Sequence, residues 1–320
     1  MFDLLEQAIR YQYPETIPVS VNCLPAAWLE RSDDFQKIAD EFPQFFNGFK
    51  YDPNNFSYIE RYSAHRWVDN WGCVWDNIHE GMDSIVTEHP IKCEEDVYKL
   101  EIPPQRNADF PHGFMYLRLL DLCGFELAMT MFADEGDELR TLISKVLEYN
   151  LNQVDSLIEM YPDSSMYSFG DDLGMQHSLA IGPEKWRKYL KPCFAEIYGR
   201  LKKSNPECLI YMHTDGCIWE IMQDLKDCGV DMVNPQFRAN GLDNLVRVCK
   251  GKIPINLDLD RQMFPFATPS QIDDHIRECV EALYLPEGGL GLSIELDQFI
   301  PTQNIYAILN AAEKYRHYKG

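Results

Sequence analysis

Two pairs of polar residues end apolar runs in the second half of the chain. His213 and Asp215 end one run, and Glu295 and Asp297 end another. In an extended segment the members of each pair point to the same side, because side chains alternate with a period of two. Imidazole nitrogen and carboxylate oxygen are ligands of Zn²⁺, so His213 and Asp215 are candidate metal ligands. The alternative for His213 is a hydrogen bond to a carboxylate without any metal. For Glu295 three roles stay open, namely a metal ligand, a general base or a solvated carboxylate.

Further carboxylates stand at similar positions. Asp258 and Asp260 close another apolar run, and Arg261 comes next, so an ion pair accounts equally well for one of the two carboxylates. Asp171 and Asp172 stand between an apolar run and a helical segment. Aspartate is a good helix N-cap, but two consecutive carboxylates exceed what one cap requires. We therefore predict Asp171, Asp172 and Asp258 as candidate catalytic residues.

Amide and aromatic side chains are candidates for binding a substrate. Asn234 and Gln236 follow an apolar run, and their amides are suited to orienting a polar molecule. Trp71 stands near Asp69 in an aromatic segment. The indole of Trp71 is predicted to wall a site for an aromatic substrate, with burial in the core as an equal alternative. Asp69 is a further candidate catalytic residue.

The apolar runs that carry these residues are expected to be β-strands separated by helices of about 10–25 residues. The expected strands are residues 16–24, 113–119, 126–132, 166–170, 208–213, 230–234, 253–258 and 290–296. A strand that closes on a polar group and leads into a helix is the repeat of a β/α barrel. The sequence therefore predicts an α/β fold, a closed (β/α)8 TIM barrel with an N-terminal extension.

Such a barrel gathers the C-terminal ends of its strands at one active site. We therefore expect one cavity to be lined by Asp69, Asp171, His213, Asp258 and Glu295. The chain is predicted to be a single domain over residues 1–320. Within it, residues 1–110 are expected to form the N-terminal extension and the loops over the mouth, and residues 111–320 the main strand–helix repeats.

Composition and charge narrow the class of function. The chain has 320 residues and a formal net charge of −22, which argues against nucleic acid and anionic membrane surfaces, because their phosphates attract lysine and arginine. Ten cysteines occur without a CxxC pair. No segment approaches the roughly 18 apolar residues of a membrane span. We therefore expect a cytoplasmic protein with reduced thiols and with neither a nucleic-acid nor a membrane partner.

An ordered set of motifs spans roughly residues 55–318. It consists of Val68-Asp-Asn-Trp-Gly-Cys-Val-Trp75 with Glu88-His-Pro90, Gly170-Asp-Asp-Leu-Gly174 with Pro183-Glu184 and Tyr189-Leu-Lys-Pro192, His213-Thr-Asp-Gly216 with Gly229-Val-Asp231 and Asn234-Pro235, and Gly288-Gly289 with Pro301 and Asn304-Ile305. Together these motifs resemble the uroporphyrinogen decarboxylase superfamily. The resemblance implies a (β/α)8 barrel and one of two activities. One is cofactor-free decarboxylation of uroporphyrinogen, and the other is zinc-dependent methyl transfer to or from a corrinoid.

Departures from the decarboxylases favour the methyltransferase branch of this resemblance. Residues 19–27 contain no arginine, where the decarboxylases carry an arginine-rich segment, and residues 286–297 contain no histidine, where the decarboxylases carry one. The coenzyme M methyltransferases hold zinc with a His-x-Cys pair and a later Cys, and here the pair is His213-x-Asp215 and the last strand offers Glu295. Oxygen and nitrogen ligands make zinc a harder Lewis acid, which suits an ether oxygen better than a thiol.

The resemblance therefore implies a methyltransferase that moves a methyl group from a small O-methyl donor, expected to be aromatic, to the cobalt of a corrinoid on a separate protein. Zn²⁺ held by His213, Asp215 and Glu295 is expected to activate the leaving group. The alternative is a cofactor-free decarboxylase of uroporphyrinogen or of a smaller carboxylated substrate, with Asp69 as its essential residue. A third hypothesis is a barrel that has lost catalysis and binds a ligand or a corrinoid protein.

Overall fold

The computed structural model describes residues 2–108 and 110–320, and the chain packs as two compact units. The first unit is built from Met1–Arg66, Asp76–Ile85 and Gln236–Gly320. The second unit is built from Trp67–Trp75 and Val86–Pro235. Each unit has its own parallel strands and its own helices.

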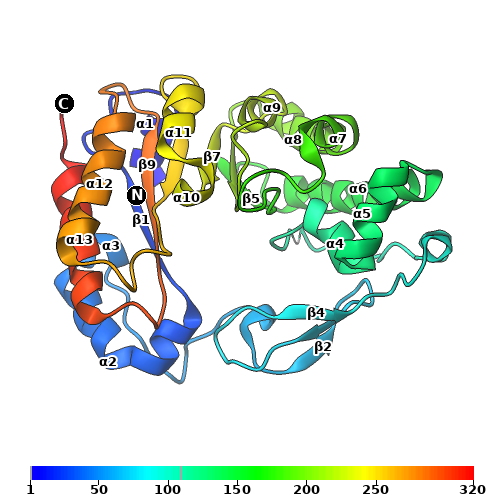
Figure 1. The fold of residues 1–320 in the computed structure, drawn as a ribbon, viewed down its shortest axis with the longest axis horizontal. Helices are drawn as coiled ribbons and strands as arrows, with labels where there is room; N and C mark the ends of the chain where they lie inside the picture. The colour runs from blue at the N-terminus through cyan, green and yellow to red at the C-terminus, as the bar shows by residue number, and fades with distance from the viewer. Residues whose placement is uncertain (1, 109) are drawn as a thin grey trace. The chain divides into compact units, whose positions relative to one another are not determined.

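The first unit has parallel strands in the order β1–β9–β8. These strands are β1 (Val19–Cys23), β8 (Ile255–Asp258) and β9 (Leu290–Leu296). The helices of this unit are α1 (Phe2–Ile9), α2 (Pro25–Glu41), α3 (Pro43–Phe46), α10 (Phe237–Asn240), α11 (Leu242–Cys249), α12 (Pro269–Leu283) and α13 (Thr302–Arg316). Helices α12 and α13 pack side by side at the orange and red end of the chain (Figure 1).

The strands of the first unit have one apolar and one polar face. One row of neighbours across the strands is Val19, Leu292 and Leu257, and the next row is Ser20, Ser293 and Asp258. Because side chains alternate along a strand, the polar residues gather on one face. Asn256 also lies on this face, where its Nδ2 donates to Ser20 Oγ at 3.2 Å. The polar face leads to Glu295 near the carboxyl end of β9.

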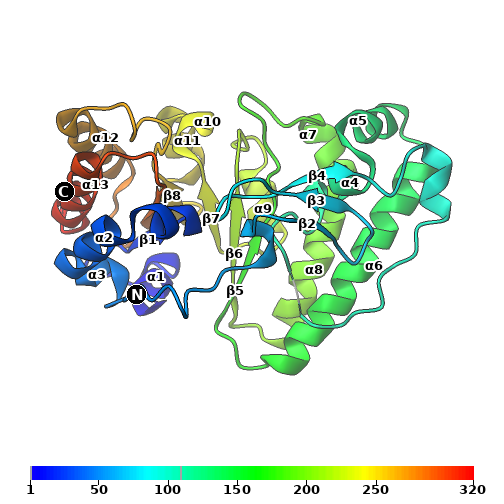
Figure 2. The same ribbon diagram turned by 90° about the horizontal axis from the view of Figure 1, so that it is seen from below.

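The second unit has parallel strands in the order β5–β6–β7. These strands are β5 (Met166–Gly170), β6 (Leu209–Thr214) and β7 (Met232–Pro235). The helices of this unit are α4 (Tyr116–Cys123), α5 (Phe125–Asp134), α6 (Asp137–Met160), α7 (Gly182–Lys185), α8 (Lys191–Ser204) and α9 (Met222–Asp227). Helices α6 and α8 pack side by side (Figure 2).

One face of the second unit's strands packs against α8. The ring centroid of Phe169 on β5 lies 5.1 Å from that of Tyr198 on α8, and Tyr198 Oη donates to Met212 Sδ on β6 at 3.1 Å. Residues that alternate with Phe169 and Met212 therefore face the other way. They include Gly170 and His213, so the histidine is directed away from α8.

Helix α6 shows how the sequence pattern becomes structure. Leu139, Leu142 and Val146 recur at helical spacing and are buried, while charged residues occupy the other face. Asp137 in the first turn suits the positive end of the helix dipole. Within the described ranges, no helix is both long and apolar enough to cross a membrane.

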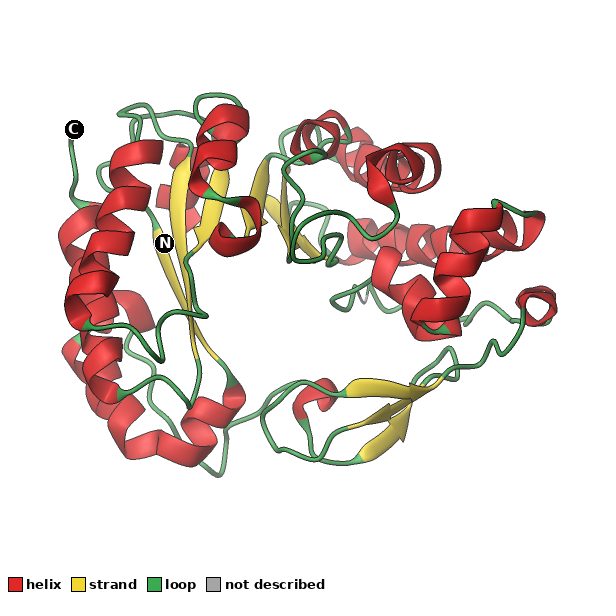
Figure 3. Ribbon diagram, viewed as in Figure 1, coloured by secondary structure: helices red, strands yellow, loops and turns green. Residues whose placement is uncertain are grey.

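A second sheet, of three strands in the order β2–β3–β4, lies mostly within the second unit (Figure 3). Its strands are β2 (Arg66–Val68), β3 (Val74–Asp76) and β4 (Ile85–Glu88). Trp67 and Trp75 stack with their ring centroids 5.4 Å apart and their planes 11° from parallel. This aromatic pair joins β2 to β3, as expected for a short sheet held by cross-strand side-chain contacts.

Two expected strands are wrong, because the segments form helices. Residues 113–119 lead into α4, and residues 126–132 lie inside α5. Both segments are rich in leucine, methionine and phenylalanine, and a short apolar run of this kind does not distinguish a buried helix from a strand. Gly124, with a φ of 78°, separates the two helices. The other expected strands are present as β1 and β5 to β9, with small differences at their ends.

His275 on α12 is a buried histidine that packs against the loop after β8. Its Nε2 accepts a hydrogen bond from the backbone N–H of Asp260 at 3.1 Å, and Phe237 packs edge-on with ring centroids 4.5 Å apart. Burial lowers the pKa of His275 to about 4, Arg238 adds to the lowering, and the charge of Asp260 opposes it. The imidazole is therefore neutral at pH 7.

The pH dependence of stability should report this burial. Between about pH 6.5 and pH 4 the unfolded chain binds a proton at His275 and the native protein does not. The contribution of neutral His275 to the free energy of unfolding is therefore complete above about pH 6.5. It is lost as the pH falls toward 4, by at most about 3 kcal/mol. Urea unfolding of the wild type and of His275→Gln at pH 7 and pH 4.5 measures it. Glutamine also accepts from the Asp260 amide, so the variant should lose less stability on acidification, and equal losses would contradict the expectation.

Candidate metal centre

A cluster of two histidines and a carboxylate lies in the second unit. His112, Asp172 and His213 each offer one ligand atom, and these atoms all lie within 4.8 Å of one another. His112 Nε2 lies 3.0 Å from Asp172 Oδ2, and His213 Nε2 lies 3.8 Å from Asp172 Oδ1. Asp215 Oδ1 lies 3.4 Å from His213 Nε2. The four side chains are between 26% and 32% exposed, although the Oδ1 atom of Asp215 is itself buried.

The register of the strands positions this cluster. Gly170 on β5, His213 on β6 and Asn234 on β7 are neighbours in one row across the strands. His213 is thus fixed on the central strand, with Asn234 on one side. Asn234 is buried, and its Oδ1 lies 2.7 Å from Nδ1 of His213.

The loops after β5 and β6 are bound to each other by the backbone. The N–H of Asp215 donates to Asp172 Oδ1 at 2.9 Å, and the N–H of Gly174 donates to the carbonyl oxygen of Asp215 at 3.1 Å. Gly216, with a φ of 84°, is so close to Gly174 that a Cβ on it would lie 2.2 Å from the carbonyl carbon of Gly174. These contacts hold Asp172 and Asp215 beside His213.

Gly170 makes room for His112. A Cβ on Gly170 would lie 2.5 Å from Nδ1 of His112, which is closer than real side chains approach. The backbone of the same loop is tied to β5, because the N–H of Gly113 donates to the carbonyl oxygen of Gly170 at 2.8 Å. The imidazole of His112 therefore takes the place that a side chain at the end of β5 would fill.

The two adjacent carboxylates differ in their surroundings. Burial would by itself raise the pKa of Asp172, but the hydrogen bond and charge of His112, the charge of His213 and the N–H of Asp215 hold that pKa below its usual range. Asp171 is fully buried, and burial raises its pKa above the usual range although backbone amides of Leu117 and Tyr116 oppose the rise.

Asp171 anchors the N-terminus of α4. Its carboxylate accepts hydrogen bonds from the backbone N–H groups of Met115, Tyr116 and Leu117. The first amides of a helix have no partner within the helix, so a carboxylate at this position stabilises its first turn. The prediction of a catalytic role for Asp171 is not tested by these contacts, which favour a positioning role.

Asp69 is surrounded by donors within the second unit. Its Oδ1 accepts from the N–H groups of Trp71 and Cys73, both at 2.9 Å. Its Oδ2 accepts from Trp75 Nε1 at 3.0 Å and from Arg118 Nη1 at 2.7 Å. Trp71 is itself buried and packs edge-on against Tyr149, with ring centroids 5.1 Å apart. Both residues have structural partners here, and their predicted catalytic and binding roles remain predictions.

The remaining predicted residues lie in the first unit. Arg261 Nη1 donates to Glu295 Oε1 at 2.6 Å, and Arg261 Nε lies 3.8 Å from Asp258 Oδ2. Asp258 pairs in a parallel bridge with Gln236. These residues form a second polar group at the carboxyl ends of β8 and β9. The structure thus brings His213 and Asp215 together with Asp172, and Glu295 together with Asp258. The single cavity expected to be lined by Asp69, Asp171, His213, Asp258 and Glu295 remains a prediction.

His112 is the ligand candidate that sequence reasoning missed. It stands before the apolar run of residues 113–119 and not at the end of one, so the rule that strand ends carry function gives no signal for it. The one sequence signal was indirect. Gly170 ends β5 without a side chain, where β6 carries His213 at the paired position.

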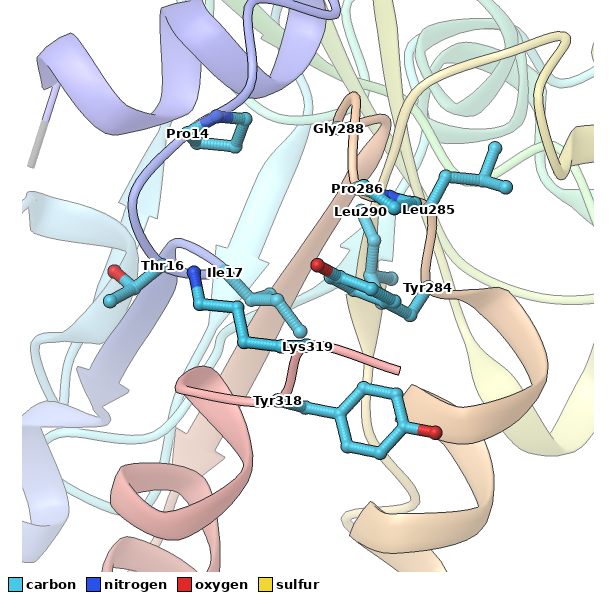
Figure 4. A pocket seen from close by; sticks show the side chains of 10 residues that line it. All are labelled: Pro14, Thr16, Ile17, Tyr284, Leu285, Pro286, Gly288, Leu290, Tyr318 and Lys319. Atoms are coloured by element: carbon cyan, nitrogen blue, oxygen red, sulfur yellow. The ribbon is translucent and has the colours of Figure 1, made fainter.

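A recess in the first unit lies at the opposite ends of its strands. It is lined by Pro14, Thr16, Ile17, Tyr284, Leu285, Pro286, Gly288, Leu290, Tyr318 and Lys319 (Figure 4). Thr16 and Ile17 precede β1, and Gly288 precedes β9. Barrel active sites form at the C-terminal ends of strands, so this recess is not the candidate active site.

Parallel strands that carry histidine and carboxylate groups at their carboxyl ends define the class of an α/β-barrel protein with a polar site. The chain belongs to the uroporphyrinogen decarboxylase (URO-D) family, whose sequence profile matches residues 119–315. A comparison with curated protein sequences gave no match.

A solved structure of a similar chain agrees with the barrel-like fold. A methyltransferase from Methanosarcina mazei is similar with a TM-score of 0.63 and 15% sequence identity, over 97% of this chain and 98% of that chain. This similarity confirms the predicted α/β fold as TIM-barrel-like. Within the described residues the barrel-type strands are six, three in each unit, and not the eight of the expected closed (β/α)8 barrel, because residues 113–119 and 126–132 contribute to helices. Xylanase 10B from Thermotoga petrophila is similar with a TM-score of 0.43 and 12% identity over 97% of each chain, which is too weak to bear on fold or function.

The contacts of Asp69 predict a large effect on stability. Asp69→Asn removes the charge that pairs with buried Arg118, and breaking a buried pair in this way costs about 3–5 kcal/mol. The matched control is Asp155→Asn, because Asp155 pairs with Arg200 at 3.0 Å and the two side chains are 40% and 36% exposed. The control should cost about 1 kcal/mol or less, as expected for an exposed ion pair. Urea unfolding measures both, and equal losses would contradict the assignment of a buried, strongly stabilising pair to Asp69 and Arg118.

Proposed function

We propose that this protein is a methyltransferase that moves a methyl group from a small O-methyl donor to the cobalt of a corrinoid carried by a separate protein. The observation that carries the proposal is the cluster of His112, Asp172 and His213 at the carboxyl ends of β5 and β6. Membership of the URO-D family and the fold shared with a methyltransferase support it. An aromatic methyl donor remains the expectation from sequence.

The candidate ligand atoms of this cluster have the chemistry and spacing that Zn²⁺ requires. Ligand atoms about 2.0–2.2 Å from a tetrahedral zinc ion lie roughly 3.4 Å apart. The contacts of 3.0 Å, 3.4 Å and 3.8 Å among His112, Asp172, His213 and Asp215 are close to that spacing. Three protein ligands with one open position are the pattern of a catalytic zinc site. We therefore propose His112, Asp172 and His213 as ligands, with Asp215 adjacent.

This ligand set differs from the one expected from sequence. Glu295 has Arg261 as a close partner in the first unit, which favours an ion pair over metal binding. His112 and Asp172 supply the imidazole and carboxylate that complete the set around His213. Glu295 therefore becomes the residue whose replacement distinguishes the two assignments.

The proposed chemistry depends on the leaving oxygen. The methyl carbon accepts an electron pair from the reduced cobalt, Co(I), of the corrinoid protein, the C–O bond of the methyl donor breaks, and the leaving oxygen keeps the electron pair of that bond. Bound zinc would supply a Lewis acid for that oxygen, and nitrogen and oxygen ligands make the zinc ion a harder Lewis acid than sulfur ligands do. The protein residues hold the ion and orient its ligands through backbone contacts of the two loops. Decarboxylation by Asp69 is the weaker alternative, because Arg118, Trp75 and two amides already occupy its oxygens.

Metal content and activity together test the proposal. The wild type should bind about one zinc per chain, and His112→Ala or His213→Ala should weaken binding by more than the roughly 10–100-fold that loss of an outer partner costs. Both variants should also lose methyl transfer to a reduced corrinoid protein. Exposed His177 gives the control His177→Ala, which should change neither property.

Glu295→Gln separates the ligand sets, since it should leave zinc bound if His112 and Asp172 are ligands. Loss of zinc in Glu295→Gln would instead support the set expected from sequence. Methyl transfer by a wild type that holds no zinc even after reconstitution would mean that a carboxylic acid protonates the leaving oxygen. A wild type with neither zinc nor transfer would leave the decarboxylase and binding hypotheses.

The place of His112 beside Gly170 gives a separate prediction. Gly170→Ala puts a methyl group 2.5 Å from His112 Nδ1, so the imidazole must move and zinc affinity should fall by about 10–100-fold. The matched control is Gly199→Ala on α8, where a Cβ meets nothing within 4 Å. Competition with a chromophoric chelator measures both affinities. An unchanged affinity in Gly170→Ala would remove His112 from the ligand set.

A further inference from the structure

Asn234 is a buried polar residue that contacts the central histidine of the cluster. It is 5% exposed on β7 and is the register neighbour of His213 on β6. Its Oδ1 lies 2.7 Å from His213 Nδ1. Burying an amide is unfavourable unless it is hydrogen-bonded, so this contact is a built part of the site.

The contact fixes which nitrogen of His213 carries the proton. An amide oxygen only accepts hydrogen bonds, so Nδ1 of His213 must donate to Asn234. In the neutral imidazole the other nitrogen, Nε2, then has a free lone pair. This is the nitrogen that faces the carboxylates of Asp172, at 3.8 Å, and Asp215, at 3.4 Å.

The surroundings of Nε2 favour the opposite tautomer. Two carboxylates close to one ring nitrogen attract a proton to it, because carboxylate oxygens accept hydrogen bonds. A proton on Nε2 would occupy the atom that must bind the metal, since only an unprotonated nitrogen is a ligand. Asn234 opposes this effect from the other side of the ring.

We infer that Asn234 is a positioning residue that holds His213 in the tautomer with an unprotonated Nε2 and so prepares the cluster for metal. This inference rests on the proposed function in taking His112, Asp172 and His213 as the metal site. A neutral amide suits the task, because it orients the ring without adding a third negative charge beside Asp172 and Asp215. Asn234 was expected from sequence to bind substrate, and the contact with His213 gives it a different role.

Two replacements separate tautomer control from simple packing. Asn234→Ala removes the acceptor, whereas Asn234→Asp keeps an oxygen acceptor in a side chain of nearly the same shape. The ring nitrogens of His213 are observed in metal-free protein by ¹H–¹⁵N NMR, with His213→Gln to assign them. The wild type and Asn234→Asp should show a proton on Nδ1, and Asn234→Ala should show it on Nε2. A wild type with the proton on Nε2 would overturn the inference.

Zinc affinity is the second measurement, by competition with a chromophoric chelator. Asn234→Ala should bind zinc about 10–100-fold more weakly than the wild type, and Asn234→Asp should recover most of the loss. The control is Asn256→Ala, because Asn256 is also a buried strand asparagine, 4% exposed, and bonds Ser20 in the first unit. It should leave zinc affinity unchanged.

The outcomes distinguish the inference from the proposed function. Equal loss of affinity in Asn234→Ala and Asn234→Asp, or no loss in either, would overturn the positioning role while leaving the metal site in place. Failure of the wild type to bind zinc would overturn the metal site. The NMR measurement on metal-free protein would then still decide whether Asn234 sets the tautomer of His213.

Discussion

The backbone contact between the loops after β5 and β6 is the constraint on which the candidate site depends. Gly174 and Gly216 approach so closely that neither tolerates a Cβ. The loops are also joined by the bond from the N–H of Leu173 to Thr214 Oγ1, at 3.1 Å, and by the bond from Asp215 to Asp172. Since parallel strands end at the same edge of a sheet, two such loops need only this tight crossing to put carboxylates beside His213.

The consecutive carboxylates connect this crossing to the rest of the second unit. Asp171 points into the core and holds the first amides of α4, while Asp172 points to His112 and His213. His112 lies three residues before Met115, and the N–H of Met115 donates a hydrogen bond to Asp171. The anchor of α4 therefore also fixes the loop that carries His112. Adjacent residues on an extended segment face opposite sides, which lets one aspartate serve packing and the next serve the site.

The strands were predictable because their apolar runs end in polar residues. β5 and β9 match the expected ranges, and the same rule made His213, Asp215 and Asp172 candidate site residues. The rule failed at α4 and α5, where an apolar run without a distinctive period becomes a helix. It also could not find His112, which comes from a loop, or the pairing of Asp69 with Arg118, which lies 49 residues away. Such contacts depend on tertiary packing, and spacing in the sequence carries no record of them.

The two units resolve the same problem of partly buried carboxylates in different ways. In the first unit arginines compensate the charge, since Arg261 pairs with Glu295 and Arg238 with Asp260. Around Asp172 the partners are the imidazoles of His112 and His213 and a backbone amide. A guanidinium carries a permanent charge and has no lone pair to offer, whereas an imidazole also exists in a neutral form that presents a lone pair. Carboxylates paired with arginine already have their negative charge compensated. Carboxylates matched with histidine gain from a divalent cation, which neutralises Asp172 and Asp215 and binds the same nitrogens.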